Sequence, residues 1–176
     1  FLHVIITNMK INFKDIAYTF FGMAYVIGCI IFLALSRGLE NGRVLIWYAI
    51  IAAWGTDIFA YLIGKRFGKH KFSQVSPKKS IEGCIAGIVG AVVIALIYTF
   101  AINSILNLSY SYVLVIIATA ILSVVGQVGD FAASSIKRYV DIKDYSNLIP
   151  GHGGMLDRID SLMFLAPFAY ILLTLI

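Results

Sequence analysis

Long apolar runs dominate the pattern of hydrophobic and polar positions along this chain. The runs Ile16 to Ser36 and Gly83 to Leu106 contain no charged residue, and Val44 to Gly64 and Tyr112 to Ile136 contain one aspartate each. A helix rises about 1.5 Å per residue, so about 20 apolar residues cross the hydrocarbon core of a bilayer. The four runs therefore predict transmembrane helices, and a shorter run, Ser161 to Ile176, predicts a fifth.

The composition supports a membrane location and argues against a soluble globular domain. Hydrophobic residues make up 60% of the chain, charged residues 13%, and the mean hydropathy is +0.91. The strands of a membrane barrel would alternate apolar and polar positions over about 10 residues, and these runs do not. We expect an all-α, polytopic integral membrane bundle of about five transmembrane helices. Because Phe1 to Thr7 reads like the end of an earlier apolar helix, we expect an N-terminally truncated piece of a longer protein.

Basic residues gather on one side of the predicted bundle. With five spans, every lysine and arginine except Arg37 and Arg43 falls on the same side of the membrane. The positive-inside rule places that side in the cytoplasm. The net charge of +5 therefore needs no nucleic-acid partner to explain it, and it favours attraction to anionic lipids and anionic solutes.

Two aspartates lie within predicted spans at matching depth. Asp57 precedes Lys65 by eight residues, and Asp130 precedes Arg138 by eight, so each is expected roughly 12 Å inward from the basic boundary. A carboxylate in hydrocarbon costs about 2.5 kcal/mol or more. Both are therefore expected to face a partner, a metal or a wet cavity.

The span around Asp130 carries a polar stripe. Gln127, Asp130, Ser134 and Lys137 recur at spacings of three, four and three, which places them on one helix face. Neighbouring glycines, at positions 126 and 129, would let another helix or a ligand approach the backbone closely. A helix interface held by polar contacts is the alternative, but an aspartate and a lysine on one stripe favour a functional site.

The segment Gly64 to Ser80, "GKRFGKHKFSQVSPKKS", is strongly basic. Anchoring at the membrane surface accounts for such a segment by default. Ser76 followed by Pro77, however, fits an N-cap and the first helical position, which would leave free backbone N–H groups beside Lys78 and Lys79. Such a helix start is suited to binding phosphate.

The final polar segment, "SSIKRYVDIKDYSNLIPGHGGMLDRID", ends in a glycine-rich turn. Glycines at positions 151, 153 and 154 let backbone N–H groups wrap around an anion, and helix is predicted to resume near residue 156. Asp157 and Asp160 then project from nearly the same face at the mouth of the last span.

Each of these residues also has an ordinary interpretation. Asp157 could favour the helix start or pair with Arg158, and His152 could be an exposed loop residue. Lysines and helix starts can hold phosphates, and carboxylates beside those phosphates require a cation. Taken together, these residues indicate a polyphosphate substrate with magnesium.

At this point the sequence resembles a known family, the phosphatidate cytidylyltransferases, also called CDP-diacylglycerol synthases. The resemblance rests on three motifs, namely "WGTDIFAYLIGKRFGKHKFSQVSPKKSIEG" from Trp54 to Gly83, "GQVGDFAASSIKR" from Gly126 to Arg138, and "S-x-x-KR", "KD" and "PGHGG-x-x-DR-x-D" between Ser134 and Asp160. It covers most of the chain from Trp54 onward.

The resemblance implies a magnesium-dependent membrane nucleotidyltransferase, with residues 1–176 as a single transmembrane catalytic domain. Such an enzyme joins CTP to phosphatidate and gives CDP-diacylglycerol and pyrophosphate in phospholipid biosynthesis. Magnesium, with a second cation such as K⁺, would lie between aspartates. By motif, Asp130 and Asp157 would be catalytic metal ligands, and Ser134 and Lys137 would complete the catalytic set.

A second set of residues is assigned to the CTP phosphates from the chemistry of phosphate binding. Its expected members are Lys78, Lys79, Gly153, Gly154, Ser76, His152 and Arg158. The expected partners are CTP, phosphatidate and membrane lipids, with no nucleic acid, and a homodimer is kept open. The expected location is the inner, or plasma, membrane, with a multi-pass chain whose active site faces the cytoplasm. The roles of Asp57 and Asp160 stay open between metal binding, pairing with lysine and shaping the cavity.

Two other functions fit parts of the pattern. A CTP-dependent kinase of a polyprenol or another lipid alcohol would share membrane helices, basic loops and metal-binding acids, but it would release CDP instead of pyrophosphate. A cation-coupled transporter would also place Asp57 and Asp130 within spans. It would not need the Lys78 and Lys79 pair or the glycine turn.

Overall fold

The structure is built from helices. The computed structural model describes residues 13–71, 79–146 and 154–176. Its helices are α2 (Phe13–Gly38), α3 (Gly42–Ile50), the π-helix η1 (Ile51–Gly55), α4 (Thr56–Phe67), α5 (Ile81–Leu106), α6 (Tyr112–Tyr139) and α7 (Leu156–Leu173). Within the described ranges, the only β-pairing is an isolated bridge between Lys71 and Ser80. The predicted all-α class is confirmed.

Four segments in the described part of the chain are long and apolar enough to cross a membrane. They are α2, the continuous run α3–η1–α4 (Gly42–Phe67), α5 and α6, each of 26 or 28 residues. At about 1.5 Å per residue each reaches about 39 Å or more, which exceeds the hydrocarbon core. Each contains one of the four predicted runs and extends it by a few residues, so the prediction of a polytopic membrane bundle is confirmed.

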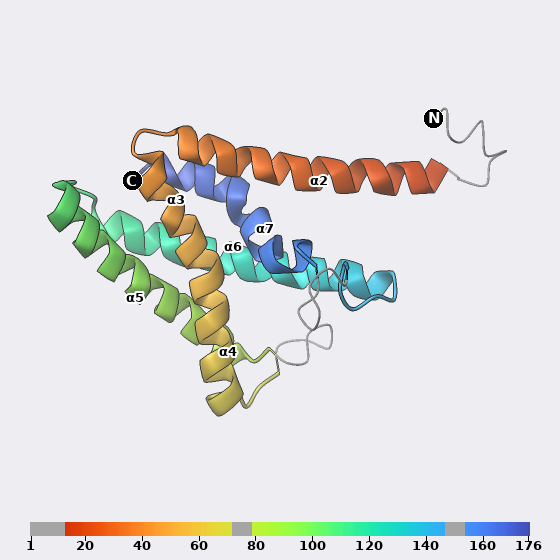
Figure 1. Cartoon of the computed structure of the whole chain (residues 1–176). Coiled ribbons are helices and arrows are strands. Elements are labelled where there is room, and N and C mark those ends of the chain that lie inside the picture. Colours follow the sequence, from red (N-terminus) through yellow and green to blue (C-terminus); the bar gives the residue numbers. More distant parts are fainter. Residues whose placement is uncertain (1–12, 72–78, 147–153) are drawn as a thin grey trace.

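The fifth predicted span corresponds to α7, which lies inside the bundle and has 18 residues. It begins at Leu156, where the sequence predicts that helix resumes. In Figure 1 it lies between α2 and α6, and it packs against both. Asp160 and Ser161 in its first half are buried with their apolar neighbours. A helix shielded in this way can carry polar groups that lipid would penalise.

Small residues allow the helices to approach closely. A Cβ added to Gly87 of α5 would lie 2.7 Å from the carbonyl oxygen of Thr56, and one added to Gly83 would lie 2.7 Å from that of Ala60. In α6, a Cβ on Gly129 would collide with the side chain of Phe164 on α7. The predicted close approach at Gly129 is therefore confirmed, and its partner is α7.

The apolar core extends to the end of the bundle where α2 turns into α3. Buried Leu45, Tyr48, Leu122 and Leu165 belong to one hydrophobic cluster that joins α3, α6 and α7. The C-terminus lies beside the turn between α2 and α3 at this end (Figure 1). Away from this end, charged side chains from the start of α7, the C-terminal half of α6 and Lys79 before α5 contact one another.

Candidate active site

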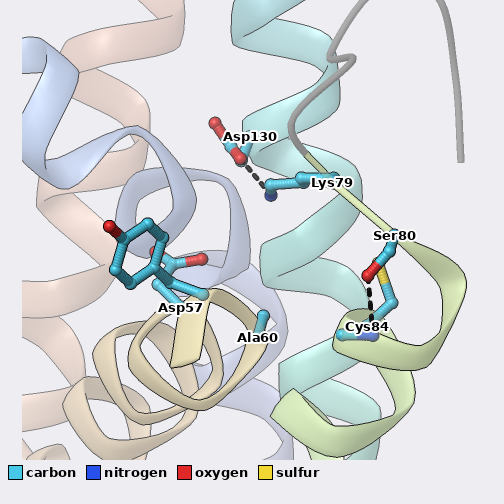
Figure 2. Close-up of a pocket in the computed structure, with 8 residues that line it drawn as sticks. Asp57, Ala60, Lys79, Ser80, Cys84 and Asp130 are labelled. Carbon is cyan, nitrogen blue, oxygen red and sulfur yellow. Dashed lines mark hydrogen bonds and ion pairs between the residues drawn. The ribbon is translucent and has the colours of Figure 1, made fainter. Parts of the chain in front are cut away.

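A cavity of about 260 Å³ opens between α4, α5 and α6. Asp57 and Tyr61 line it from α4, Asp130 from α6, and Lys79 from the segment before α5. Figure 2 shows Asp57 and Asp130 entering the cavity from different helices, with Lys79 reaching toward Asp130. The two aspartates that the sequence places at matching depth are therefore brought to one cavity. The π-helix η1 ends directly before α4, and its wider turn changes the angular position of the residues that follow, including Asp57.

Lys79 and Asp130 form an ion pair across this cavity. Their side chains are 20% and 24% exposed, so the pair is partly shielded from solvent. The Lys79 ammonium also lies 4.9 Å from the centroid of the Phe131 ring, which favours a cation over the ring face. The residue predicted to hold phosphate and the residue predicted to hold a metal are thus direct partners in this structure.

The start of α5 differs from the sequence prediction. The helix begins at Ile81, and its cap is Ser80, whose Oγ accepts a hydrogen bond of 3.1 Å from the Gly83 N–H. The predicted start at Pro77 with a cap at Ser76 is therefore wrong for α5, and Lys79 precedes the helix. Ser76, Pro77 and Lys78 lie outside the described residues.

The reason for the later start is visible in the contacts of Glu82. Its carboxylate accepts backbone N–H groups of Lys69 at 3.2 Å and His70 at 3.3 Å, and its Oε1 lies 2.6 Å from the His70 ring nitrogen. The chain after α4 is thereby fastened to the first turn of α5. This places Ser80 at the helix start and directs Lys79 toward the cavity.

A second charged cluster lies at the start of α7. Lys137 Nζ donates to Asp157 Oδ1 at 2.9 Å and lies 3.8 Å from Asp160 Oδ2. The prediction that Asp157 and Asp160 share a face is confirmed, since both contact this lysine. The side chains of Lys137 and Asp157 are only 11% and 7% exposed.

Asp157 also organises the segment before α7. Its Oδ2 accepts the backbone N–H groups of Tyr145 and Gly154, each at 2.9 Å. The N–H of Gly154, predicted to face a phosphate, is therefore directed at a carboxylate in this structure. A carboxylate in the first turn of a helix is also stabilised by the helix dipole.

Tyr145 is part of this cluster, although the sequence did not single it out. The Lys137 ammonium lies 5.1 Å from the centroid of its ring, and its hydroxyl donates to the Ala133 carbonyl at 3.3 Å. Burial raises the pKa of the Tyr145 phenol above its ordinary value, so the hydroxyl keeps its proton as a donor.

Ser161 joins the two clusters into one charged centre. Its hydroxyl donates to Asp57 Oδ2 at 3.4 Å, and its backbone N–H donates to Asp160 Oδ1 at 2.8 Å. The Asp160 carboxylate also interacts electrostatically with Asp130, Lys137 and Asp57. We call this set the charged centre. Its charged members are Asp57, Asp130, Asp157, Asp160, Lys79 and Lys137.

Only some of the remaining predicted residues lie at the charged centre. Ser134 is half-buried on α6, between Asp130 and Lys137 on the same helix face. Gln127 instead donates to the Cys84 carbonyl at 3.1 Å, so for this member of the stripe the helix-interface interpretation holds. Arg158 is exposed on α7. His152 and Gly153 lie outside the described residues.

The charged centre fits a divalent cation in charge and in donor type. Its four carboxylates exceed its two ammonium groups by two charges, and carboxylate oxygens are the ligands that Mg²⁺ prefers. In the arrangement seen here, no three His, Cys, Asp or Glu side chains of the described ranges form a metal-binding group. The oxygens of Asp130 and Asp157 are occupied by Lys79 and Lys137 instead.

Fold and site together define a polytopic membrane protein with a charged centre shielded between its spans. Carboxylates that can bind a cation and ammonium groups that can bind an anion are both present there, which suits a phosphate-bearing substrate accompanied by a metal. Comparison with known proteins agrees with this class. The family model of the cytidylyltransferase family matches residues 1–176.

Three relatives show the same likeness, and all are named phosphatidate cytidylyltransferase. The protein of Bacillus subtilis (strain 168) is 39% identical over 175 residues, which cover 98% of this chain and 64% of the relative. Those of Staphylococcus haemolyticus (strain JCSC1435) and Staphylococcus aureus (strain COL) are each 38% identical, over 97% of this chain and 64% of the relative. The chain belongs to the cytidylyltransferase family, and it spans 64% of the length of these curated relatives.

Proposed function

We propose that this chain is the catalytic membrane domain of an enzyme that transfers the cytidylyl group of CTP to phosphatidate. The observation that carries the proposal is the charged centre. In it, aspartates from α4, α6 and α7 lie together with lysines from α6 and from the segment before α5. Membership of the cytidylyltransferase family and the names of the relatives support the same reaction.

The reaction forms one phosphorus–oxygen bond and breaks another. A phosphate oxygen of phosphatidate attacks the α-phosphorus of CTP, the α–β anhydride bond breaks, and pyrophosphate leaves with the bonding electrons. A phosphate monoester already carries an anionic oxygen near neutral pH, so the protein need not supply a nucleophile. Catalysis then consists chiefly of positioning and of charge neutralisation.

Magnesium, with a second cation such as K⁺, would be held by Asp130 and Asp157 and would neutralise phosphate oxygens. For the carboxylates to bind a cation, the two lysines would have to exchange partners. Lys79 would leave Asp130 for a CTP phosphate, and Lys137 would turn from Asp157 toward an anionic oxygen at the same centre. Each exchange frees a carboxylate that is paired in this structure.

The remaining residues of the charged centre position these groups. The Ser161 hydroxyl joins α7 to Asp57 of α4, and Asp160 lies 3.8 Å from Lys137 of α6. Ser134 lies beside Asp130 and Lys137 and completes the polar face of α6. Lys78, Ser76, His152, Gly153, Gly154 and Arg158 stay predicted CTP contacts.

The proposed location is the inner, or plasma, membrane, with the charged centre on the cytoplasmic side. The sequence places every lysine and arginine except Arg37 and Arg43 on one side of the membrane, and the positive-inside rule makes that side cytoplasmic. Aqueous CTP can approach from that side, while the acyl chains of phosphatidate stay in lipid. A homodimer stays a prediction.

The test is product analysis with the full-length protein in membranes. With CTP, magnesium and phosphatidate we expect lipid-dependent release of pyrophosphate, and less release with other nucleoside triphosphates. Release of CDP with transfer of one phosphate to a lipid alcohol would show the kinase instead. Cation uptake that depends on Asp130, without CTP binding, would show the transporter.

A further inference from the structure

An apolar groove of about 630 Å³ lies between α2 and α6, outside the charged centre. Gly22 and Tyr25 line it from α2, Ile136 and Tyr139 from α6, Tyr145 from the segment after α6, and Leu156 from the start of α7. We call it the α2–α6 groove. Its volume falls within the range of pockets that take small ligands, about 300 to 1,000 Å³.

Tyr145 joins the groove to the charged centre. Tyr145 lines the groove, and its ring lies 5.1 Å from the Lys137 ammonium while its backbone N–H donates to Asp157. A molecule in the groove would therefore have an apolar body between α2 and α6 and a polar end beside Lys137.

The position of the groove in the bundle indicates which molecule that is. Tyr139 is the last residue of α6, Tyr18 is near the start of α2, and both line the groove. Tyrosines at span ends mark the membrane boundary, where lipid headgroups meet acyl chains. At this depth an apolar groove whose lining residue Tyr145 lies beside the Lys137 ammonium matches an anionic phospholipid in charge and in polarity.

We propose that the α2–α6 groove holds an acyl chain of phosphatidate and brings its phosphate to Lys137. This rests on the proposed function, because the lipid is the substrate assigned there. The groove thereby fixes where the lipid enters the charged centre, namely between α2 and α6. CTP approaches the same centre through the cavity lined by Asp57, Lys79 and Asp130.

The chain offers a matched pair of variants to test this. Gly22 lines the groove and Gly28 lies on the same helix outside it, and a Cβ added to either meets nothing within 4 Å. Leucine favours helix over glycine, so Gly22→Leu and Gly28→Leu should both fold. Gly22→Leu alone fills the groove.

The first measurement compares full-length variants in detergent with dioleoyl and dihexanoyl phosphatidate. Gly22→Leu should raise the KM for the long-chain lipid by about fourfold for each methylene it displaces. The KM for the short-chain lipid and the values for Gly28→Leu should stay near those of the unmodified protein. Equal effects of the two variants at both chain lengths would overturn the proposal.

The second measurement does not depend on turnover. Phosphatidate with a photoreactive diazirine in its acyl chain should label α2 and α6 peptides that line the groove, and Gly22→Leu should reduce that labelling. Equal labelling by the matching phosphatidylcholine probe would show ordinary surrounding lipid and overturn the proposal. Selective labelling without pyrophosphate release would support lipid binding in the groove and contradict the proposed reaction. Pyrophosphate release with unselective labelling would support the reaction and contradict lipid binding in the groove.

Discussion

At the residue scale, the central feature is that each candidate metal ligand is paired with a lysine. Asp130 pairs with Lys79 and Asp157 with Lys137; the first pair is partly shielded from solvent and the second is largely shielded. Removing one member of a buried pair leaves an uncompensated charge, so the four residues are coupled. A phosphate and a divalent cation arriving together would satisfy all four at once, since each lysine and each carboxylate gains a new partner.

Replacing Asp130 by asparagine tests the carboxylate. Asp130→Asn removes the charge but keeps the shape, so the protein should still insert, while pyrophosphate release should fall by about 100-fold or more because the moving phosphate oxygens lose their neutralising cation. Steady-state assays at saturating magnesium check this. Asp141→Asn is the control, because Asp141 is exposed and its φ of 55° is one that asparagine readily adopts. Equal activity of the two variants would remove Asp130 from the catalytic set.

Replacing Lys79 by alanine tests the assignment to CTP. Hydrogen bonds to charged groups contribute about 1.5–3 kcal/mol, so Lys79→Ala should raise the KM for CTP by about 10- to 100-fold and change kcat less. Lys71→Ala is the control, since Lys71 is an exposed member of the same basic segment. A fall in kcat at an unchanged KM for CTP would place Lys79 at the reacting phosphorus instead.

At the element scale, the contact between α6 and α7 sets the geometry of the charged centre. Gly129 packs directly against Phe164, and its neighbour Asp130 interacts electrostatically with Asp160 on α7. Close packing of the two helices is therefore what brings their carboxylates together. The absence of a side chain at position 129 is a requirement of the site as well as of the fold.

A valine at position 129 should separate these helices. Gly129→Val places two methyl groups where Phe164 now lies, and overpacking of this kind costs about 1–3 kcal/mol. Thermal unfolding in detergent should show a lower midpoint than for Gly28→Val, whose added atoms meet open space. Equal midpoints for the two single variants would show that the contact is not tight.

Local capping rules do not predict the correct first residue of α5. Two serines in the same basic segment, Ser76 and Ser80, could each cap a helix, and Pro77 favours the first. The structure uses Ser80, because Glu82 holds the backbone of Lys69 and His70 against the first turn. That contact spans more than ten residues, and a local capping rule does not include it.

At the scale of the whole molecule, the sequence predicts the bundle well because hydrocarbon imposes strict rules. Span length, the side that carries the lysines and the depth of Asp57 and Asp130 all follow from apolar runs and charge positions. The convergence of α6 and α7 depends instead on packing at Gly129, so spacing along the chain indicates it only in part. Asp160 and Ser161 gain their roles from that packing.

Tyr145 was missed for a related reason. It lies between helices, where no periodicity orients it, and only the folded chain shows its ring beside Lys137 and its N–H on Asp157. Ser161 carried a weak signal, since it follows Asp157 by four residues and so shares its helix face. Charged residues were easier to single out because their burial alone requires an explanation.

The most direct test of the charged centre is Mn²⁺ binding to the full-length protein, measured by electron paramagnetic resonance with CTP present. Mn²⁺ replaces Mg²⁺ at oxygen ligands and gives a signal without turnover. If Asp130 and Asp157 serve one centre, Asp130→Asn and Asp157→Asn should each abolish the same bound-ion signal, and the double variant should lose nothing more. Two separate signals, each lost with only one of the variants, or a signal that survives in both, would contradict a shared centre.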